Sequence, residues 1–583
     1  MKRKLTSLFL CLILLTSLLA GCVGKNEREN NSLTNGQTKD YINSSGVDKY
    51  PRFITVDLFN SYSNYQGIQG GWFGHVIKER FNMELNIIAP NASGSGDTLY
   101  QTRSAAGNIG DLIIFNLEGG KLQELVSAGL VLDMSPYIKK SKNLETYKRA
   151  IDTTNKKLVS ETGTWAIPSE VTVQSSTDMI NTVSLNSGIY IRWDLYKQLG
   201  YPKMATFEDL LPVMKDMQDI AGTSDSGKKV YAFSLFKDWD VAIIQAGQQL
   251  PANYGWGMEG FVLQKADDSE DPIDFLAENS PYIRGLRFFY QANQMGLLDP
   301  ESRTQNWNTL YGKYEDGSVL YSPWPWLGKV AYNTSVHTEE GKGFHTAAID
   351  DLTIREWGCY ENGNPEYGIM VGSRAQDSQR MVDFIDWLYS PEGIQMSQFA
   401  IVDEMYELEN GLPVLTELGK EVFLEGDADM PDNYNGGSYK DGRSQLGFKI
   451  VSISEMNPAT GYTYTQETWP SYIEVTSTSI DIDWQNHMGA SNATEYWKKN
   501  NQICISPGTD YAAPPDSTDI ATMRSQITEI SKEYSWKAIY AKDDADFNAI
   551  IAEMRTIVEG LGYYDVVKVD MDNAAALKAA RWE

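Results

Sequence analysis

The chain has 583 residues, too many for a single hydrophobic core, and this length predicts two or more lobes. Hydrophobic residues make up 42% of the sequence and charged residues 22%, proportions typical of a globular protein. The formal net charge of −28 argues against nucleic acid as a partner and against electrostatic binding to an anionic membrane surface.

The N-terminus has the features of a bacterial lipoprotein signal. Basic residues 2–4 precede an apolar stretch, residues 5–19, that is too short to span a membrane comfortably. Residues 19–22, Leu-Ala-Gly-Cys, resemble the lipobox at which such signals are cut. The resemblance implies a signal peptide over residues 1–21 and a lipid on Cys22, which would hold the protein at the outer face of the bacterial cell membrane. An ordinary secretory signal with a chance cysteine is the alternative.

A tether is predicted between this signal and the folded part. Residues 22–50 are rich in Asn, Ser, Thr, Gly and Lys and have few apolar side chains to bury. Ordered structure is expected from residue 53, where strand 53–59, helix 72–81 and strand 84–88 form a βαβ unit.

Polar side chains follow the predicted strands of this first part. Asn60 follows strand 53–59, and Asn116 and Glu118 follow the apolar strand 112–115. Ligands of open α/β sheets bind beyond the carboxyl ends of strands. We therefore take these three side chains as candidate ligand contacts, together with Trp72.

Aromatic side chains supply the other candidates in the middle of the chain. Trp324 and Trp326 each follow a proline, and proline fixes φ and lacks an N–H, so the strand that begins near residue 319 must end there. Rigid indoles suit a wet cleft, where the face stacks and the edge donates a hydrogen bond. Trp239 and the glycine-flanked pair Tyr254 and Trp256 are further candidates. Packing in a core is the alternative for all of them.

The last 180 or so residues offer fewer signals. Trp469 and Trp484 are taken as additional candidate contacts there. Cys359 and Cys504 remain after the signal and Cys22 are set aside, and their distance in sequence is weak evidence for a disulfide. No cluster of Cys and His has the spacing of a zinc site.

Several segments resemble signature segments of one family: residues 104–115, 121–133, 164–168, 187–200, 280–300, 315–326 and 386–393. The Pro-Trp-Pro-Trp run, residues 323–326, is similar to a segment of maltose-binding protein whose first tryptophan stacks on a sugar ring. It departs from that segment at Ser322, where the family has Gly, and at Pro325, where it has Ala. The chain resembles extracellular solute-binding protein family 1, in its larger oligosaccharide-type branch, over about residues 53–400.

The resemblance implies a two-lobed α/β fold of the periplasmic-binding-protein type, class II, with a hinge and a ligand cleft between the lobes. Residues 51–166 and about 338–400 are assigned to the N-terminal lobe. Residues 167–337 and about 401–583 are assigned to the C-terminal lobe. Arg192 would answer ligand hydroxyls, with a structural ion pair as its alternative role.

Residues 222–229 look like two kinds of site and fit neither. Lys229 occupies the position where a phosphate loop needs Ser or Thr, and a strand follows instead of a helix. Relatives that bind acidic oligosaccharides often carry a calcium loop here, but only Asp225 and Gly227 match it, and Lys228 stands where an oxygen ligand is needed. No cofactor is predicted, and calcium would need ligands that this loop lacks.

The implied function is that of the lipid-anchored binding component of an ABC importer, a monomer that binds a carbohydrate of the oligosaccharide type and delivers it to permease subunits. No motif of a hydrolase is present, although a glycosidase carboxylate pair does not show in sequence. The alternatives are a secreted glycoside-processing enzyme, an adhesion or sensory lipoprotein of the same fold, and a binding protein for peptides or other polar solutes.

Overall fold

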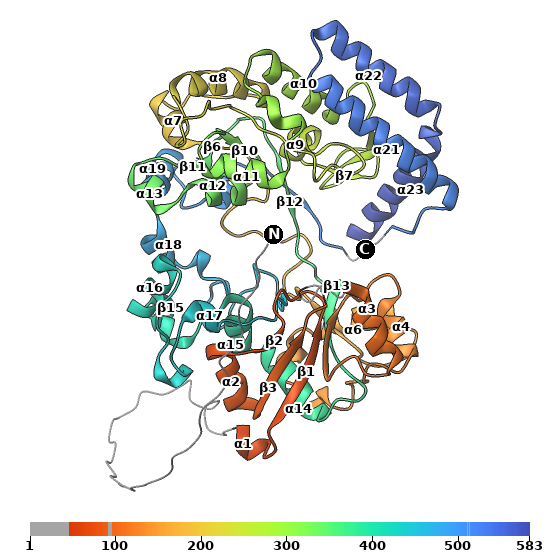
Figure 1. The fold of residues 1–583 in the computed structure, drawn as a ribbon, viewed down its shortest axis with the longest axis vertical. Helices are drawn as coiled ribbons and strands as arrows, with labels where there is room; N and C mark the ends of the chain where they lie inside the picture. The colour runs from red at the N-terminus through yellow and green to blue at the C-terminus, as the bar shows by residue number, and fades with distance from the viewer. Residues whose placement is uncertain (1–45, 91, 93–95, 510, 512, 583) are drawn as a thin grey trace, which may run out of the picture. The chain divides into compact units, whose positions relative to one another are not determined.

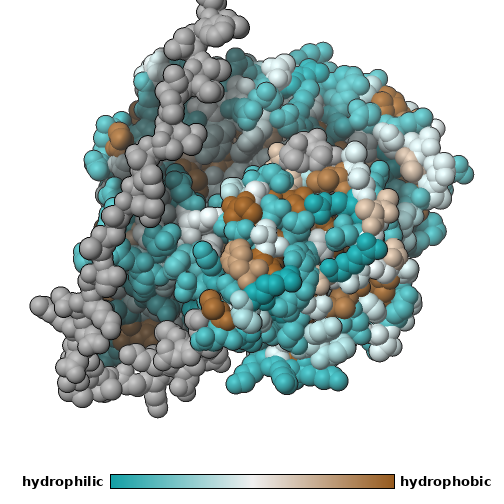
Figure 2. Space-filling view, turned by 60° about the horizontal axis from the view of Figure 1, so that its bottom comes forward, coloured by the Kyte–Doolittle hydropathy of each residue, from teal (hydrophilic) through white to brown (hydrophobic). Residues whose placement is uncertain are grey.

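The computed structural model describes residues 46–90, 92, 96–509, 511 and 513–582 (Figure 1). The predicted signal peptide, Cys22 and nearly all of the predicted tether lie outside the described residues. Among the described helices, none is both long and apolar enough to cross a membrane. The face of the molecule in Figure 2 is mostly hydrophilic, with hydrophobic residues interspersed in small groups.

A six-stranded sheet organises the first lobe. Its strand order is β2-β3-β1-β4-β13-β5, in which β1 is parallel to β3 and β4, and β13 is antiparallel to β4 and β5. The strands are β1 Ile54–Asn60, β2 Gly67–Ile68, β3 Met83–Ile88, β4 Leu112–Phe115, β5 Ile167–Ser169 and β13 Asn364–Val371. The predicted βαβ opening is confirmed, with its helix α2 at Gly71–Phe81.

Both faces of this sheet are covered by helices, which explains the continuous apolar run in β4. Leu112 and Ile114 point into one core cluster, with α2 and α14 (Ser378–Leu388), whereas Ile113 points into the other, with α4 (Lys121–Ser127). Successive side chains of a strand alternate between its faces, so a strand covered on both sides needs an apolar residue at every position.

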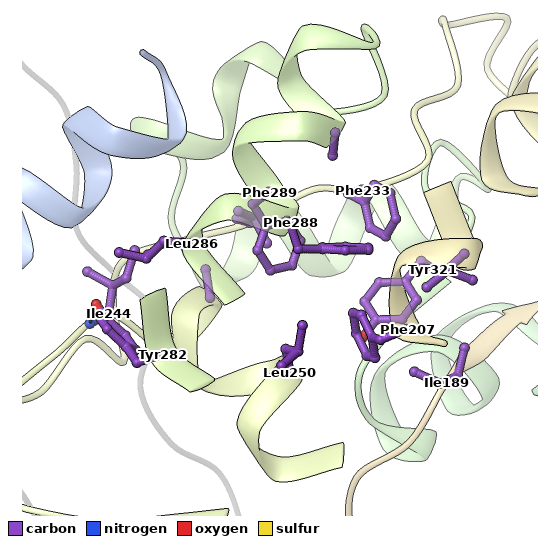
Figure 3. Close-up of a cluster of buried hydrophobic side chains, with 14 of the residues drawn as sticks. Ile189, Phe207, Phe233, Ile244, Leu250, Tyr282, Leu286, Phe288, Phe289 and Tyr321 are labelled. Carbon is purple, nitrogen blue, oxygen red and sulfur yellow. Dashed lines mark hydrogen bonds between the residues drawn. The ribbon is translucent and has the colours of Figure 1, made fainter. Parts of the chain in front are cut away.

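The second lobe has a larger aromatic core around a three-stranded sheet. The sheet order is β10-β6-β11, from Tyr321–Ser322, Tyr190–Arg192 and Phe344–Thr346. Figure 3 shows Phe207, Phe233, Phe288 and Tyr321 gathered in this core, with ring centroids of Phe207 and Phe288 4.7 Å apart. Phe207 precedes helix α8 (Leu210–Ile220) and packs in this core.

The chain returns to each lobe more often than the sequence indicated. Residues 401–469 contribute to the first lobe's core, through Ile401, Val451 and Trp469 among others, although we expected this stretch in the second lobe. Conversely, Ile349 and Ile354 pack in the second lobe's core. The predicted lobe boundaries therefore need correction at both places. The sequence after residue 400 carries few landmarks, so nothing in it marked the return to the first sheet.

Three segments pass from one core to the other. The first two run side by side: the Ile180 amide donates to the Trp357 carbonyl oxygen at 3.0 Å, and the Cys359 amide donates to that of Asp178 at 2.8 Å. The third joins helices α18 (Pro470–Thr476) and α19 (Ser479–Met488). Cys359, like Cys504, is a buried free thiol, so the two do not pair.

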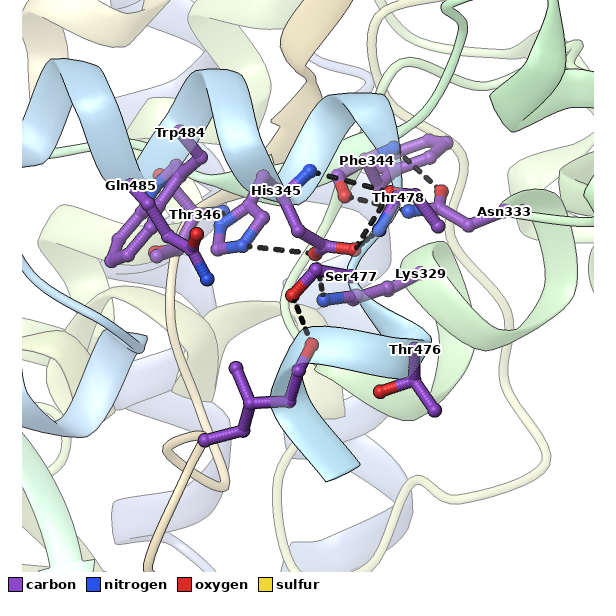
Figure 4. A network of polar contacts seen from close by, with 12 residues as sticks. Lys329, Asn333, Phe344, His345, Thr346, Thr476, Ser477, Thr478, Trp484 and Gln485 are labelled. Atoms are coloured by element: carbon purple, nitrogen blue, oxygen red, sulfur yellow. Dashed lines mark hydrogen bonds and ion pairs between the residues drawn. The ribbon is translucent and has the colours of Figure 1, made fainter. Parts of the chain in front are cut away.

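A partly buried polar network holds the start of α19 (Figure 4). The Lys329 ammonium lies 2.6 Å from the Asp481 carboxylate, and His345 Nε2 lies 3.5 Å from the same oxygen. The Thr478 hydroxyl and Asp481 also form a capping box at the helix N-terminus. The third crossing is thus tied to the second lobe by charge-assisted contacts.

Candidate functional site

Four tryptophans of the second lobe contact one another and still reach solvent. Trp239 stacks on Trp307 with ring centroids 4.7 Å apart, and Trp324 stacks on Trp326 at 4.9 Å. The two pairs are joined because Trp239 lies 5.7 Å from both Trp324 and Trp326. Trp239 is 41% exposed and Trp326 is 36% exposed. We call these residues the four-indole cluster.

Local structure explains how the cluster is displayed. The strand β10 ends after two residues, and Pro325 starts helix α12 (Pro325–Tyr332) at the first helical position, where its missing N–H costs nothing. Trp324 is therefore the N-cap residue in extended conformation, and Trp326 lies in the first turn. Trp307 begins helix α11 (Trp307–Glu315), which is capped by the side chain of Asn306.

The cluster differs from a packed core in its hydrogen bonding. None of its four indole N–H groups donates to another of the described residues. A buried indole N–H usually has a partner, as Trp72, Trp469 and Trp484 do in the cores of this chain. The free N–H groups and exposed ring faces make the cluster a rigid platform that can stack on an apolar face and donate at its edge.

A polar cavity of about 270 Å³ adjoins the cluster, since Trp324 lines both. Helix α9 (Gln245–Asn253) supplies most of its amide side chains, and strand β12 (Ile354–Trp357) supplies Arg355. The lining residues are Ser187, Gln245, Gln248, Gln249, Pro251, Ala252, Asn253, Trp256, Gly257, Met258, Leu263, Pro323, Trp324 and Arg355. We call this space the amide cavity.

Three residues that line the amide cavity each have a buried polar atom without a partner among the described residues: Gln249 Oε1, Asn253 Oδ1 and Arg355 Nε. Buried polar groups are nearly always hydrogen-bonded, so unpaired ones on residues that line a cavity make this cavity a candidate ligand site. Burial, together with the nearby Arg581 charge, lowers the pKa of Arg355 to about 10, and the guanidinium stays charged at neutral pH. Two acceptors and a charged donor suit a ligand rich in hydroxyl groups.

Three predicted contact tryptophans belong to the cores. Trp72, Trp469 and Trp484 are fully buried, and each donates its indole N–H to a backbone carbonyl oxygen at 2.9, 3.2 and 2.7 Å respectively. Their rings and donors are already occupied by protein, so the structure corrects their assignment from ligand contact to packing.

Two predicted polar contacts are also occupied. Asn60 is buried, donates to the Leu446 carbonyl oxygen at 2.6 Å and accepts two backbone amides in the following turn. Arg192 forms a bidentate pair with Asp194 at 2.9 and 2.8 Å and lies over the Tyr332 ring. Arg192 therefore has the alternative role, that of a structural ion-pair partner.

The glycine-flanked pair divides between two roles. Trp256 is only 6% exposed but lines the amide cavity, so one edge of it remains available there. Tyr254 donates to the Asp351 carboxylate at 3.0 Å, and the Arg284 guanidinium lies over its ring. Its hydroxyl holds two charged side chains together and is not part of the cavity lining.

The first lobe contributes strand-end groups that belong to a different sheet from the four-indole cluster. Asn116 Oδ1 accepts the Glu118 amide at 2.8 Å, so both residues form a local turn after β4, and their side chains stay partly exposed. Tyr62 stacks on Tyr367 with centroids 4.3 Å apart and donates to the Glu366 carbonyl oxygen. Burial raises the pKa of Tyr62, so this hydroxyl is a neutral donor at physiological pH.

The loop that resembles a calcium site is closed by protein groups. Asp316 Oδ1 accepts the Ser226 amide at 2.9 Å, and Asp225 pairs with His337 Nε2 at 2.8 Å. Among the described residues, no group of three or more His, Cys, Asp or Glu side chains has the arrangement of a metal site.

Comparison with known proteins gives a consistent fold. No family model matches the chain. The fructooligosaccharide ABC transporter substrate-binding protein FusA of Streptococcus pneumoniae serotype 4 is 27% identical over 148 residues, which cover 24% of this chain and 26% of FusA. This match spans about a quarter of the relative's length.

Solved structures extend the likeness to nearly the whole chain. The S. pneumoniae ABC-transporter substrate-binding protein FusA, as an EF-hand mutant in complex with fructo-nystose, superposes with a TM-score of 0.53 at 14% identity, covering 90% of this chain and 99% of that one. The chain has the solute-binding-protein fold. An HMO-binding solute-binding protein and an extracellular solute-binding protein, both from Bifidobacterium longum infantis, give TM-scores of 0.52 and 0.54 at 12% identity, each covering 90% of this chain and 98% of its own.

This structural similarity confirms the predicted two-lobed α/β fold. Sequence reasoning missed Trp307, Arg355 and the amides of α9. The α9 amides had a usable signal, because Gln245, Gln249 and Asn253 recur every four residues and so share one face of a helix. Trp307 and Arg355 had none, since each reaches the site only through the fold.

Proposed function

We propose that the chain is the extracytoplasmic solute-binding component of an ABC importer and that it binds an oligosaccharide. The observation that carries the proposal is the four-indole cluster beside the amide cavity. Stacked, exposed indoles offer flat apolar faces to sugar rings, and the unpaired Gln249, Asn253 and Arg355 atoms offer partners for hydroxyls. The names of FusA and of the HMO-binding protein support a carbohydrate ligand.

The mechanism we propose is ligand-driven closure of the two lobes. The second lobe would hold the sugar by stacking. The strand-end groups of the first lobe, Tyr62, Asn116 and Glu118, would form hydrogen bonds with the sugar when the lobes approach. A ligand that contacts both lobes binds the closed state better than the open one and so shifts the population toward closure. The paired crossing segments, residues 172–180 and 357–360, are the natural place for the hinge.

The proposal also covers location and partners. A lipid on Cys22 would anchor a monomer to the outer face of the cell membrane, where it meets the permease subunits. Replacing this cysteine, as in Cys22→Ser, should release the protein into the medium while leaving ligand affinity unchanged. Retention of that variant in the membrane fraction would contradict the anchor.

The decisive experiment is a binding screen with the purified protein. Thermal melting is measured against a panel of neutral and acidic oligosaccharides, and each ligand that raises Tm is titrated by calorimetry. A ligand that binds the native state alone at a hundred times its Kd stabilises by about 2.7 kcal/mol, which a melting curve resolves.

Two outcomes would contradict the proposal. If the ligand is recovered as shorter fragments after incubation, the protein is a glycoside-processing enzyme. If short peptides raise Tm and no saccharide does, the four-indole cluster serves another polar solute.

A further inference from the structure

Arg355 is a charged side chain in the amide cavity without an acidic partner. It donates no hydrogen bond to the described residues and forms no ion pair with them, and its Nε atom is buried. Its guanidinium lies over Trp357, with the carbon 3.8 Å from the ring centroid. Gly257 makes room for it, because a Cβ atom there would come within 2.7 Å of Nε.

Other arginines of this chain form ion pairs with aspartates. The buried Arg192, Arg380 and Arg581 lie 2.8 to 3.3 Å from an aspartate oxygen, and the partly buried Arg524 lies 2.7 Å from one. A charge withdrawn from water without a partner is costly, so such pairing is the normal solution. Arg355 is kept in place by stacking alone, and its N–H groups have no acceptor among the described residues.

The charges around Arg355 do not replace a partner. Glu259, on strand β7 (Trp256–Glu259), attracts the guanidinium from a distance, and Arg581 of helix α23 (Tyr563–Trp582) repels it. Glu356 is the next residue on β12, but its carboxylate accepts the Asn181 amide on the other face of the strand. No carboxylate among the described residues comes within ion-pair distance of Arg355.

We propose that the ligand carries a carboxylate, as a uronic acid residue does, and that Arg355 binds it with two parallel hydrogen bonds. This proposal rests on the proposed saccharide-binding function and narrows it to acidic saccharides. The guanidinium fork matches a carboxylate in shape and charge, whereas the rest of the cavity presents neutral amides that suit hydroxyls. The formal net charge of −28 gives no long-range attraction for an anion, so the selectivity comes from contact.

Matched pairs of oligosaccharides test the proposal on the wild-type protein. Oligomers of galacturonic, glucuronic and mannuronic acid are titrated beside neutral oligomers of galactose, glucose and mannose with the same linkage and length. We expect one acidic oligomer to bind at least about tenfold more tightly than its neutral counterpart. Equal or tighter binding of the neutral members would overturn the inference and leave the proposed function intact. Binding of neither kind would refute the proposed function itself.

Variants then assign the preference to the side chain. Arg355→Gln should remove the preference for the acidic oligomer, and Arg355→Lys should retain part of it, because the charge remains but the fork is lost. Arg287→Gln, at an exposed arginine on helix α10 (Pro281–Gln294), should leave the preference unchanged. A preference that persists in a folded Arg355→Gln variant would contradict the proposed contact.

Discussion

Replacement of Trp324 by alanine tests the central claim most directly. This indole stacks on Trp326, contacts Trp239 of the other stacked pair and lines the amide cavity. Its loss therefore removes a ring from both the four-indole cluster and the amide cavity. An aromatic contact is worth about 0.5–1.5 kcal/mol beyond area burial, and burying the indole face against a sugar adds to this. We expect Trp324→Ala to weaken oligosaccharide binding by at least about 1 kcal/mol, which is roughly fivefold or more in Kd.

The same substitution should change the stability of the free protein little. Trp324 is partly exposed, its indole N–H has no partner among the described residues, and it caps α12 without a side-chain hydrogen bond. Trp484→Ala is the matched comparison, because that indole is fully buried, stacks on His345 at 4.2 Å and donates to Thr346. It should cost about 3–5 kcal/mol of stability.

Calorimetric titration and thermal melting of both variants separate these outcomes. If Trp324→Ala melts as early as Trp484→Ala and keeps its affinity for the ligand, the Trp324 ring belongs to the core and our reasoning fails. Trp582→Ala, at a 56% exposed tryptophan near the end of the chain, controls for the loss of any surface indole.

Three further predictions follow from the same structure. Trp307→Ala should weaken binding about as much as Trp324→Ala. In a double-mutant cycle, the double variant should lose less binding free energy than the sum of the two single losses, because both residues belong to the four-indole cluster. Addition of EDTA should leave Tm and affinity unchanged, since loop 222–229 is closed by Asp316 rather than by a metal; a large drop in Tm would show that a cation is bound. Burial, aided by the Lys329 charge, lowers the pKa of His345 to about 4, below its ordinary value of about 6.5. As pH falls, the His345 imidazole therefore takes up a proton in the unfolded chain before it does so in the folded protein. The free energy of unfolding should decline by about 3 kcal/mol between about pH 6.5 and pH 4. Chemical denaturation of His345→Gln should show a shallower decline, and an identical slope would contradict the assignment.

The sequence predicted the fold better than the site, and tryptophan shows why. The prolines at 323 and 325 interrupt a strand, and this local effect predicted the break at which Trp324 and Trp326 are displayed. Trp469 and Trp484 have no such neighbours, and an indole suits a core as well as a surface. Only their hydrogen bonds to backbone carbonyls, formed with residues on other elements, decide between the two.

Tertiary contacts hide the remaining site residues in the same way. Strand β12 carries Arg355 beside Trp357, and two residues on the same face of a strand do not by themselves signal a site. The glycine at 257 that leaves room for the guanidinium is about 100 positions away in the chain. Likewise, Asp570 and Asp268 lie 46 and 313 positions from their partners Arg524 and Arg581, and could not be matched to them before the fold was known.

The two buried thiols have a practical consequence. Among the described residues Cys359 and Cys504 are the only cysteines, and both are shielded from reagents in the native state. In a Cys22→Ser variant without residues 1–21, a single cysteine introduced on the exposed surface next to Trp326 would therefore take up a maleimide dye selectively. Such a labelled protein would report occupancy of the neighbouring indoles by fluorescence, without any chemistry on the sugar.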